Sequence, residues 1–388
     1  MTKVYLDNGA TSYPKAPNVA EVITNYITNI GCNINRGTYE DAFQTERIVY
    51  ETRELICSIF NFETAENVIF TKNITESLNV LIKGLLKPND HVIVSSIEHN
   101  AVMRPLNSLC KRDINFSKIP CSNKGELYIE QLEKYIQPNT KAVIMTEASN
   151  VCGTILPLKE VGEFCKLKNL YFIVDTAQSA GFLDIDMKKL NADAIAFTGH
   201  KGLLGPQGIG GFIINDKLAS MISPLIEGGT GSASDSEYQP EYMPDKFESG
   251  TMNIPGVFGL NASLKYIEEI GLSYIREKEL YLTEKFISEI KNMPKVKLIG
   301  LDGIKNRTAV VSLDFTPFDF DNAAVAFTLC KDFNILTRCG LHCAPSAHQT
   351  LGTFPAGTVR FSFGHANSLK DVKYAVDSIF NITMRIMS

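Results

Sequence analysis

The sequence of 388 residues lacks an excess of positive charge. It contains 38 Lys and Arg against 43 Asp and Glu, a formal net charge of -5. Nucleic acids and anionic membranes attract clustered positive charge, so we expect neither as the main partner. No apolar run approaches the length of a membrane-spanning helix, and the first residues contain no apolar signal-peptide core. These absences favour a cytoplasmic protein.

The cysteines also lack a recognisable spacing pattern. There are 9 of them, an odd number, and no C-x-x-C motif occurs. A disulfide scaffold is therefore not expected, and a reducing compartment is the simplest setting. The two closest cysteines, Cys339 and Cys343, have no second pair of ligands at a suitable spacing, so we expect no metal site.

Internal repeats and low-complexity segments are absent as well, and the length suits two to three domain-sized units or one large domain with an accessory one. Short apolar runs alternate with longer amphipathic ones, which predicts a mainly parallel sheet covered by helices on both faces. The ligand site of such a sheet lies at the carboxyl ends of its strands. The predicted strands are 68–70, 91–94, 142–146, 171–174, 194–197 and 211–214, and the helices between them are 76–84, 127–135 and 158–168.

The composition changes over residues 228–256, which are rich in Gly, Ser, Pro and acidic residues and show no clear period. A loop of this length is usually functional. The helical and strand patterns that follow it suit a smaller α+β domain. We therefore predict a large domain over residues 16–254 and a small domain over residues 1–15 and 255–388.

The segment Phe197-Thr198-Gly199-His200-Lys201 is the strongest local signal for chemistry. A lysine at the carboxyl end of a strand, among small residues, suits a Schiff base with a carbonyl cofactor, because burial lowers its pKa. Taken alone, the segment also fits an ordinary surface lysine in a turn.

Asp175 ends another predicted strand, 26 residues before Lys201, and Gln178 follows it. One helix-plus-strand unit fits this spacing, so both residues should lie at neighbouring strand ends. A carboxylate there can pair with a protonated pyridine nitrogen of a cofactor, and Gln178 can donate to a ring oxygen. The alternative is an aspartate that caps a helix or turn.

Two further segments follow predicted strands. Residues 71–76 (TKNITE) open a helix, whose first N–H groups, including those of Ile74 and Thr75, suit a phosphate. Simple capping by Asn73 or Thr75 explains this segment equally well. Residues 95–100 (SSIEHN) offer His99, which is placed to stack on a cofactor ring.

The last group of residues lies near the C-terminus. Cys343 stands beside His342 in a Gly/Ala/Pro-rich loop, and positive neighbours such as Arg338 favour a nucleophilic thiolate. Arg360 alternates with apolar residues in a predicted strand and is suited to bind a carboxylate. An inert cysteine and a structural ion pair are the alternatives.

Together these motifs resemble the class V enzymes that depend on pyridoxal 5'-phosphate (PLP), and specifically the cysteine desulfurases. The resemblance extends from residues 5–8 (YLDN) to the strand with Arg360, and its most specific pieces are EHNAV, SNVCGT, VDTAQSAG, TGHKGLLGPQGIGG, ESGT and RCGLHCA. The short loop around Cys343 is similar to that of the Suf-type (group II) branch. The resemblance implies the aspartate aminotransferase-like PLP fold type I.

The resemblance also implies roles for individual residues. Lys201 would bind the cofactor covalently, Cys343 would attack the substrate sulfur, and His99 would stack on the ring and assist proton transfer. The remaining cofactor-binding residues would be Ile74, Thr75, Asn150, Asp175, Gln178, Thr198, His200 and, from the partner subunit of a homodimer, Thr251. Arg360 would bind the substrate carboxylate, and Arg338, Asn35 and Arg36 would line the entrance.

The activity implied is the conversion of L-cysteine to L-alanine, with a persulfide left on Cys343 for an acceptor protein or a small thiol. Iron–sulfur cluster assembly is one pathway that uses sulfur mobilised in this way. A selenocysteine lyase or another C–S/C–Se lyase on the same scaffold is the nearest alternative, and a class V aminotransferase is a more distant one.

Overall fold

The computed structural model describes residues 3–35 and 37–384, and these form two principal sheets. The larger sheet has seven strands in the order β2-β8-β7-β6-β5-β3-β4, and β8 runs antiparallel to both of its neighbours. The other five strands, β7 to β4 in this order, are parallel. The predicted α/β fold with a mainly parallel sheet is thus confirmed. The seven strands are β2 (Val68–Thr71), β3 (His91–Ser95), β4 (Asn115–Ile119), β5 (Thr140–Thr146), β6 (Tyr171–Asp175), β7 (Ala194–Thr198) and β8 (Gly210–Ile214).

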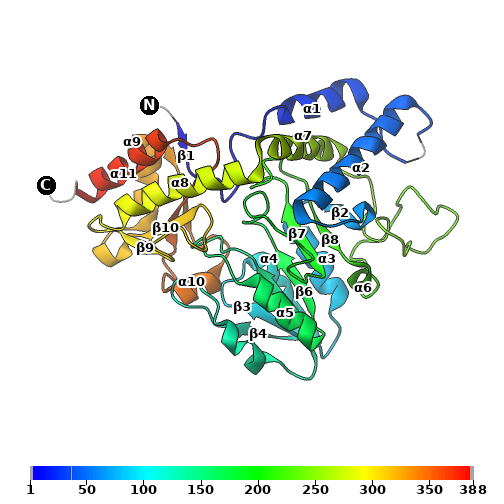
Figure 1. Cartoon of the computed structure of the whole chain (residues 1–388), viewed down its shortest axis with the longest axis horizontal. Helices are drawn as coiled ribbons and strands as arrows, with labels where there is room; N and C mark the ends of the chain where they lie inside the picture. The colour runs from blue at the N-terminus through cyan, green and yellow to red at the C-terminus, as the bar shows by residue number, and fades with distance from the viewer. Residues whose placement is uncertain (1–2, 36, 385–388) are drawn as a thin grey trace.

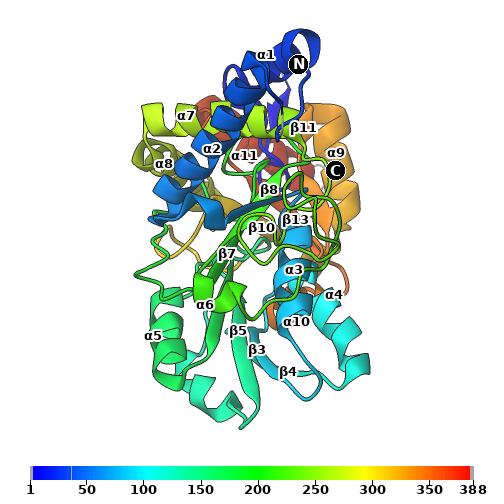
Figure 2. The same cartoon turned by 90° about the vertical axis from the view of Figure 1, so that its right-hand side faces the viewer.

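Helices cover both faces of this sheet, as Figure 2 shows for α5 on one side and α3 and α4 on the other. Alternate residues of a strand face the two cores: Val143 and Met145 of β5 pack in one, and Ala142 and Ile144 pack in the other. The helices of this part are α1 (Val19–Asn25), α2 (Glu40–Phe60), α3 (Ile74–Leu85), α4 (Asn100–Leu109), α5 (Leu158–Lys168), α6 (Asp216–Ala219) and α7 (Ile254–Ile270). The predicted helix at 127–135 is a 3₁₀ helix over Ile129–Tyr135.

The smaller sheet is antiparallel, with the strand order β12-β13-β10-β9, and it lies with α9 and α11 at one end of the molecule (Figure 1). The N-terminal strand β1 joins this end, because it pairs with β11 in parallel. The elements are β1 (Val4–Tyr5), α8 (Leu272–Ile290), β9 (Lys297–Ile299), β10 (Val310–Asp314), α9 (Asn322–Phe333), β11 (Ile335–Leu336), β12 (Arg338–Gly340), α10 (Pro345–Leu351), β13 (Thr358–Ser362) and α11 (Leu369–Met384). The domain boundary near residue 255 stays a prediction.

Between α6 and α7 the chain forms no helix or strand over residues 220–253, in agreement with the predicted long loop. The helical pattern that follows is divided into α7 and α8 at Gly271, whose φ of 84° lies in the left-handed region that favours glycine. No described helix combines the length and the apolar character needed to cross a bilayer.

Candidate active site

Lys201 and Asp175 lie at the carboxyl edge of the large sheet. Asp175 is the last residue of β6 and pairs in register with Ala196 of β7, and Lys201 follows the end of β7. Loss of hydration lowers the pKa of Lys201 to about 8, and the positive charge of Arg360 adds to this effect while Asp175 opposes it. Burial raises the pKa of the Asp175 carboxyl, which accepts a hydrogen bond from the N–H of Ala177 at 2.9 Å. The two predicted strand-end residues are therefore electrostatically coupled.

His99 precedes α4 and caps it. Its Nδ1 accepts a hydrogen bond from the N–H of Ala101 at 3.0 Å, so we assign the ring proton of the neutral imidazole to Nε2. Burial, followed by the positive charges of Lys201 and Arg360, lowers the pKa of His99 to about 4. The ring is therefore neutral at ordinary pH and presents one N–H donor.

The predicted phosphate site contains polar atoms that the protein itself does not satisfy. Thr198 Oγ1 and His200 Nδ1 are buried and have no hydrogen-bond partner among the described residues. Burial lowers the pKa of His200 to about 4, so its ring is neutral. Unsatisfied buried polar atoms are costly in a native protein and point to a missing ligand. This pair fits the phosphate of PLP.

The segment 71–76 leads from the end of β2 into α3, which begins at Ile74, so it follows a strand and opens a helix as predicted. Asn73 caps the helix by accepting a hydrogen bond from the N–H of Glu76 at 3.1 Å, so the capping alternative is correct for this residue. The first N–H groups of a helix, here those of Ile74 and Thr75, have no partner within it. Capping and anion binding are thus compatible at this helix end.

Asn150 and Gln178 use their side-chain amides within the chain. Asn150 Nδ2 donates to the carbonyl of His342 at 2.7 Å, and Gln178 Nε2 donates to the carbonyl of Gly9 at 3.0 Å. Each amide nitrogen carries two hydrogens. Among the described residues, one donor on each side chain therefore remains for a ligand.

Arg360 is 2% exposed, and two of its three guanidinium nitrogens have hydrogen-bond partners. Its Nη1 donates to the carbonyl of Asn150 at 3.0 Å, its Nη2 donates to Asp7 at 3.1 Å, and its Nε is buried without a partner among the described residues. Arg338, whose side chain is half-exposed, binds the same Asp7 carboxylate through Nε and Nη2 at 3.0–3.2 Å. The two arginines predicted to meet the substrate thus share an internal carboxylate.

Cys343 is exposed and lies on a loop that is fixed from two sides. The carbonyl of Cys343 accepts from the N–H of Asn100, the residue after His99, at 2.8 Å. The carbonyl of its neighbour His342 accepts from Asn150, which also holds Arg360. Both His342 and Cys343 have a positive φ, at 48° and 57°. The loop therefore presents the thiol on a constrained backbone next to the predicted cofactor residues.

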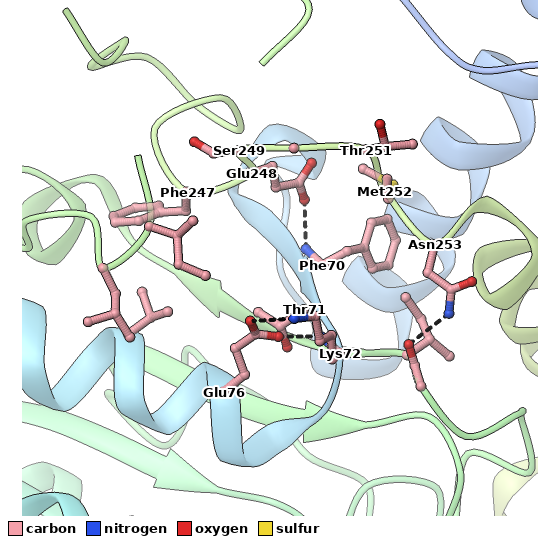
Figure 3. A pocket seen from close by; sticks show the side chains of 16 residues that line it. Phe70, Thr71, Lys72, Glu76, Phe247, Glu248, Ser249, Thr251, Met252 and Asn253 are labelled. Carbon is pink, nitrogen blue, oxygen red and sulfur yellow. Dashed lines mark hydrogen bonds and ion pairs between the residues drawn. The ribbon is translucent and has the colours of Figure 1, made fainter. Parts of the chain in front are cut away.

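Thr251 and Asn35 line pockets other than the one that contains Lys201. Thr251 lines a pocket with Phe70, Lys72 and Glu76 (Figure 3), and it shares a second pocket with Asn35. Neither residue lines the cavity that contains Lys201. Arg36 falls outside the described residues. The structure thus does not bring Thr251 and Asn35 to the Lys201 site of the same chain.

Sequence reasoning assigned no role to two buried acids near this site. Asp7 belongs to the YLDN segment, which carried part of the resemblance, but nothing local indicated its arginine partners. Glu98 precedes His99, and burial raises its pKa to about 8. It accepts hydrogen bonds from Ser95 Oγ at 2.5 Å and from the N–H of Thr146, so it links the ends of β3 and β5. In the sequence, its place in the EHNAV motif is the feature that could have indicated a role for it.

The chain is similar to known proteins over nearly its whole length. The profile of the family "Aminotransferase class-V" matches residues 4–375. The chain belongs to the class-V aminotransferase family. Among its relatives in that family are cysteine desulfurases, and it belongs with them. A "Probable cysteine desulfurase" of Pyrococcus abyssi is 33% identical over 377 residues, which cover 95% of this chain and 92% of the relative.

Solved structures agree with this assignment. The apo structure of a cysteine desulfurase from Thermococcus onnurineus NA1 has a TM-score of 0.91 and 32% identity, with 98% of this chain and 94% of that chain covered. The cysteine desulfurase CsdA of Escherichia coli, in an S-sulfonic acid form, has a TM-score of 0.88 and 26% identity, with 99% and 95% covered. The predicted family and fold type are thereby confirmed.

Proposed function

We propose that this chain is a PLP-dependent cysteine desulfurase that converts L-cysteine to L-alanine and receives the sulfur on Cys343. The observation that carries the proposal is the position of the Cys343 loop. Its two hydrogen bonds connect an exposed thiol to the segment of His99 on one side and to the Asn150–Arg360 contact on the other. A family aminotransferase would need no such thiol at this place.

The residues present fit PLP. Thr198, His200 and the first turn of α3 would hold its phosphate, Asp175 would face its ring nitrogen, and Lys201 would bind it covalently. When bound, PLP draws electrons away from the α carbon of an amino acid.

The chain's own groups would do the rest of the chemistry. Lys201, with its pKa lowered to about 8, is suited to accept the α proton near neutral pH. The Nε–H of Arg360, which has no partner in the part of the chain that the structure describes, is available for the substrate carboxylate. The Cys343 thiolate attacks the substrate sulfur, so an S–S bond forms on the enzyme while the C–S bond of the substrate breaks. Protonation of that carbon and the return of a proton to the α carbon give alanine.

Alanine released from L-cysteine in the presence of a reductant tests the proposal. We expect the native chain to form alanine and Cys343→Ser to form at least about 10²-fold less, because the hydroxyl cannot accept the sulfur. Cys330→Ser is the matched control, since Cys330 is also exposed but lies on α9. Equal alanine from native chain and Cys343→Ser would refute the persulfide step and favour a lyase. Transfer of the amino group to a keto acid without alanine would favour an aminotransferase.

The homodimer is part of the proposal. Thr251 and Asn35 line one pocket, and Lys201 lines another. This separation supports the proposal that Thr251 and Asn35 contribute to the active site of the partner subunit. We expect sedimentation to give twice the mass of one chain. Thr251→Ala should weaken PLP binding at equilibrium dialysis by about tenfold, because one hydrogen bond to a charged phosphate is lost, while Thr251→Ser should retain it. A monomer that binds PLP and turns over at full rate would contradict this role.

We further propose that the persulfide sulfur passes to an acceptor protein or small thiol, with iron–sulfur cluster assembly as the candidate pathway. The described cysteines are all free, which is compatible with a reducing cytoplasm. The Suf-type branch remains a prediction from the RCGLHCA motif.

A further inference from the structure

The segment 150–153 follows β5 of the large sheet, but its backbone is bound by residues of the small sheet and the turn before it. Each of its four carbonyl oxygens accepts a hydrogen bond, at 2.7–3.3 Å, from the residues 307–312 or from β13. Backbone that is bound in this way should move only together with its neighbour. Asn150 accepts from Arg360, Val151 from Ser312 Oγ, Cys152 from Arg307 and Gly153 from the N–H of Thr308.

Arg307 is 1% exposed, and the hydrogen-bond partners of its side chain are backbone carbonyls. Its Nη2 donates to Cys152 at 3.3 Å and to Val310 of β10 at 2.7 Å, so one nitrogen joins the segment 150–153 to the small sheet. Its Nη1 donates to Leu301. None of the ion pairs among the described residues includes Arg307. The side chain therefore acts as a fork of donors that fixes backbone, and not as one half of an ion pair.

Two glycines allow the two parts of the chain to approach this closely. A Cβ on Gly153, which has a φ of 75°, would lie 2.5 Å from the carbonyl oxygen of Val310. A Cβ on Gly300, which has a φ of 92°, would lie 2.7 Å from the Cβ of Cys152. Both distances are too short for real atoms, so the contact requires glycine on each side.

Asn150 connects this segment to the candidate active site in two directions. Its carbonyl accepts from Arg360, and its side-chain amide donates to the carbonyl of His342, the residue before Cys343. The place of Asn150 therefore sets the arginine and the thiol loop relative to each other. In a reaction between two bound groups, a displacement of about 1 Å can lower the rate by about 10²-fold.

We propose that Arg307 is a positioning residue for sulfur transfer. By holding the segment 150–153 on β10, it keeps Asn150 where Cys343 is aligned with an amino acid bound at Arg360. The inference rests on the proposed function, because it takes Cys343 as the sulfur acceptor and Arg360 as the group that binds the carboxylate. Arg307 does not line the cavity that contains Lys201, so it acts through Asn150.

Hydrogen exchange of the cofactor-free chain tests the attachment itself. In Arg307→Met we expect the N–H groups of Thr308 and Asn100 to exchange at least about tenfold faster, because they donate to the carbonyls of Gly153 and Cys343. Arg307→Lys should behave in the same way, since a lysine keeps the charge but loses the fork. Retained protection of β6 would show that both variants are folded. Arg276→Met is the matched control, because Arg276 is exposed on α8, and it should leave the exchange unchanged.

A double-mutant cycle on the PLP-loaded chain tests the positioning role. Arg307→Met should lower kcat for alanine formation at least about tenfold, while the dissociation constant of L-alanine changes less than about threefold, because Arg360 keeps its bond to Asp7. Combined with Asn150→Ala, it should add no further loss, since both changes act through the same residue. A residue that only stabilises the fold would give additive losses, and this result would overturn the proposal.

A second variant keeps the proposal falsifiable if Arg307→Met folds poorly. Ser312→Ala removes the hydrogen bond to Val151 and should give the same changes in exchange and in kcat, but smaller ones. Unchanged exchange at Thr308 and Asn100 in the folded variants would overturn the proposal, and so would faster exchange with an unchanged kcat. Exchange is measured without PLP and without L-cysteine. Absence of alanine formation in the native chain would therefore count against the proposed function, while the exchange result still decides the attachment.

Discussion

Lys201→Ala is expected to lower alanine formation from L-cysteine by at least about 10³-fold, because it removes both the covalent anchor of PLP and the proposed base. Reduction of the native, PLP-loaded chain with borohydride should leave a pyridoxyl group on the peptide that contains Lys201, as seen by mass spectrometry. The variant should remain folded and carry no such group.

Lys15 provides a matched control for this assignment. Burial also lowers its pKa to about 8, but its Nζ donates to Thr11 Oγ1, Ser12 Oγ and the carbonyl of His200. Its ammonium is thus already engaged with three oxygens. We expect Lys15→Ala to keep the pyridoxyl group on Lys201. A pyridoxyl group on Lys15, or one that persists in Lys201→Ala, would refute the role of Lys201.

Glu248→Ala is expected to lower the free energy of unfolding by about 3–5 kcal/mol, since it leaves a buried arginine without its counter-ion. Arg53 donates to both carboxylate oxygens of Glu248 at 2.7 and 3.0 Å, and both side chains are less than a tenth exposed. Glu248 also accepts from the N–H of Phe70 in β2 at 2.6 Å (Figure 3). The change should be measured by urea unfolding of the cofactor-free chain.

Glu63 is the control for this prediction. It forms an ion pair with Lys188, and both side chains are more than half exposed. Glu63→Ala should cost less than about 1 kcal/mol. The double variant Arg53→Met with Glu248→Leu should regain much of the loss, because no buried charge then remains. A loss below 1 kcal/mol for Glu248→Ala would show that the pair contributes little.

The Arg53–Glu248 pair also has a functional consequence. Glu248 stands three residues before Thr251, and its contacts attach the ESGT segment to α2 and β2. The pair therefore holds the ESGT segment in place. Thr251 of this segment is the residue proposed to bind the phosphate at the active site of the partner subunit. Weaker PLP binding should accompany the loss of stability.

The sequence alone determined the sheet and the strand-end part of the site. Apolar runs separated by amphipathic helices specify parallel strands, and parallel strands bring their carboxyl ends to one edge. The proximity of Asp175 and Lys201 follows from this rule, because Asp175 ends β6 and Lys201 follows the end of the neighbouring parallel strand β7. The capping of α3 by Asn73 was also a local property, decided by side-chain chemistry within one helical turn.

Only the tertiary structure decided the contacts made across long distances in the chain. Nothing local to Asp7 indicated Arg338 and Arg360, because the pairing depends on strand register and on the path of the N-terminal segment. The attachment of the Cys343 loop to Asn100 and Asn150 has the same origin. Hydrophobic periodicity indicates which face of a helix or strand is buried. It contains no information about which charged residues from distant segments will pair.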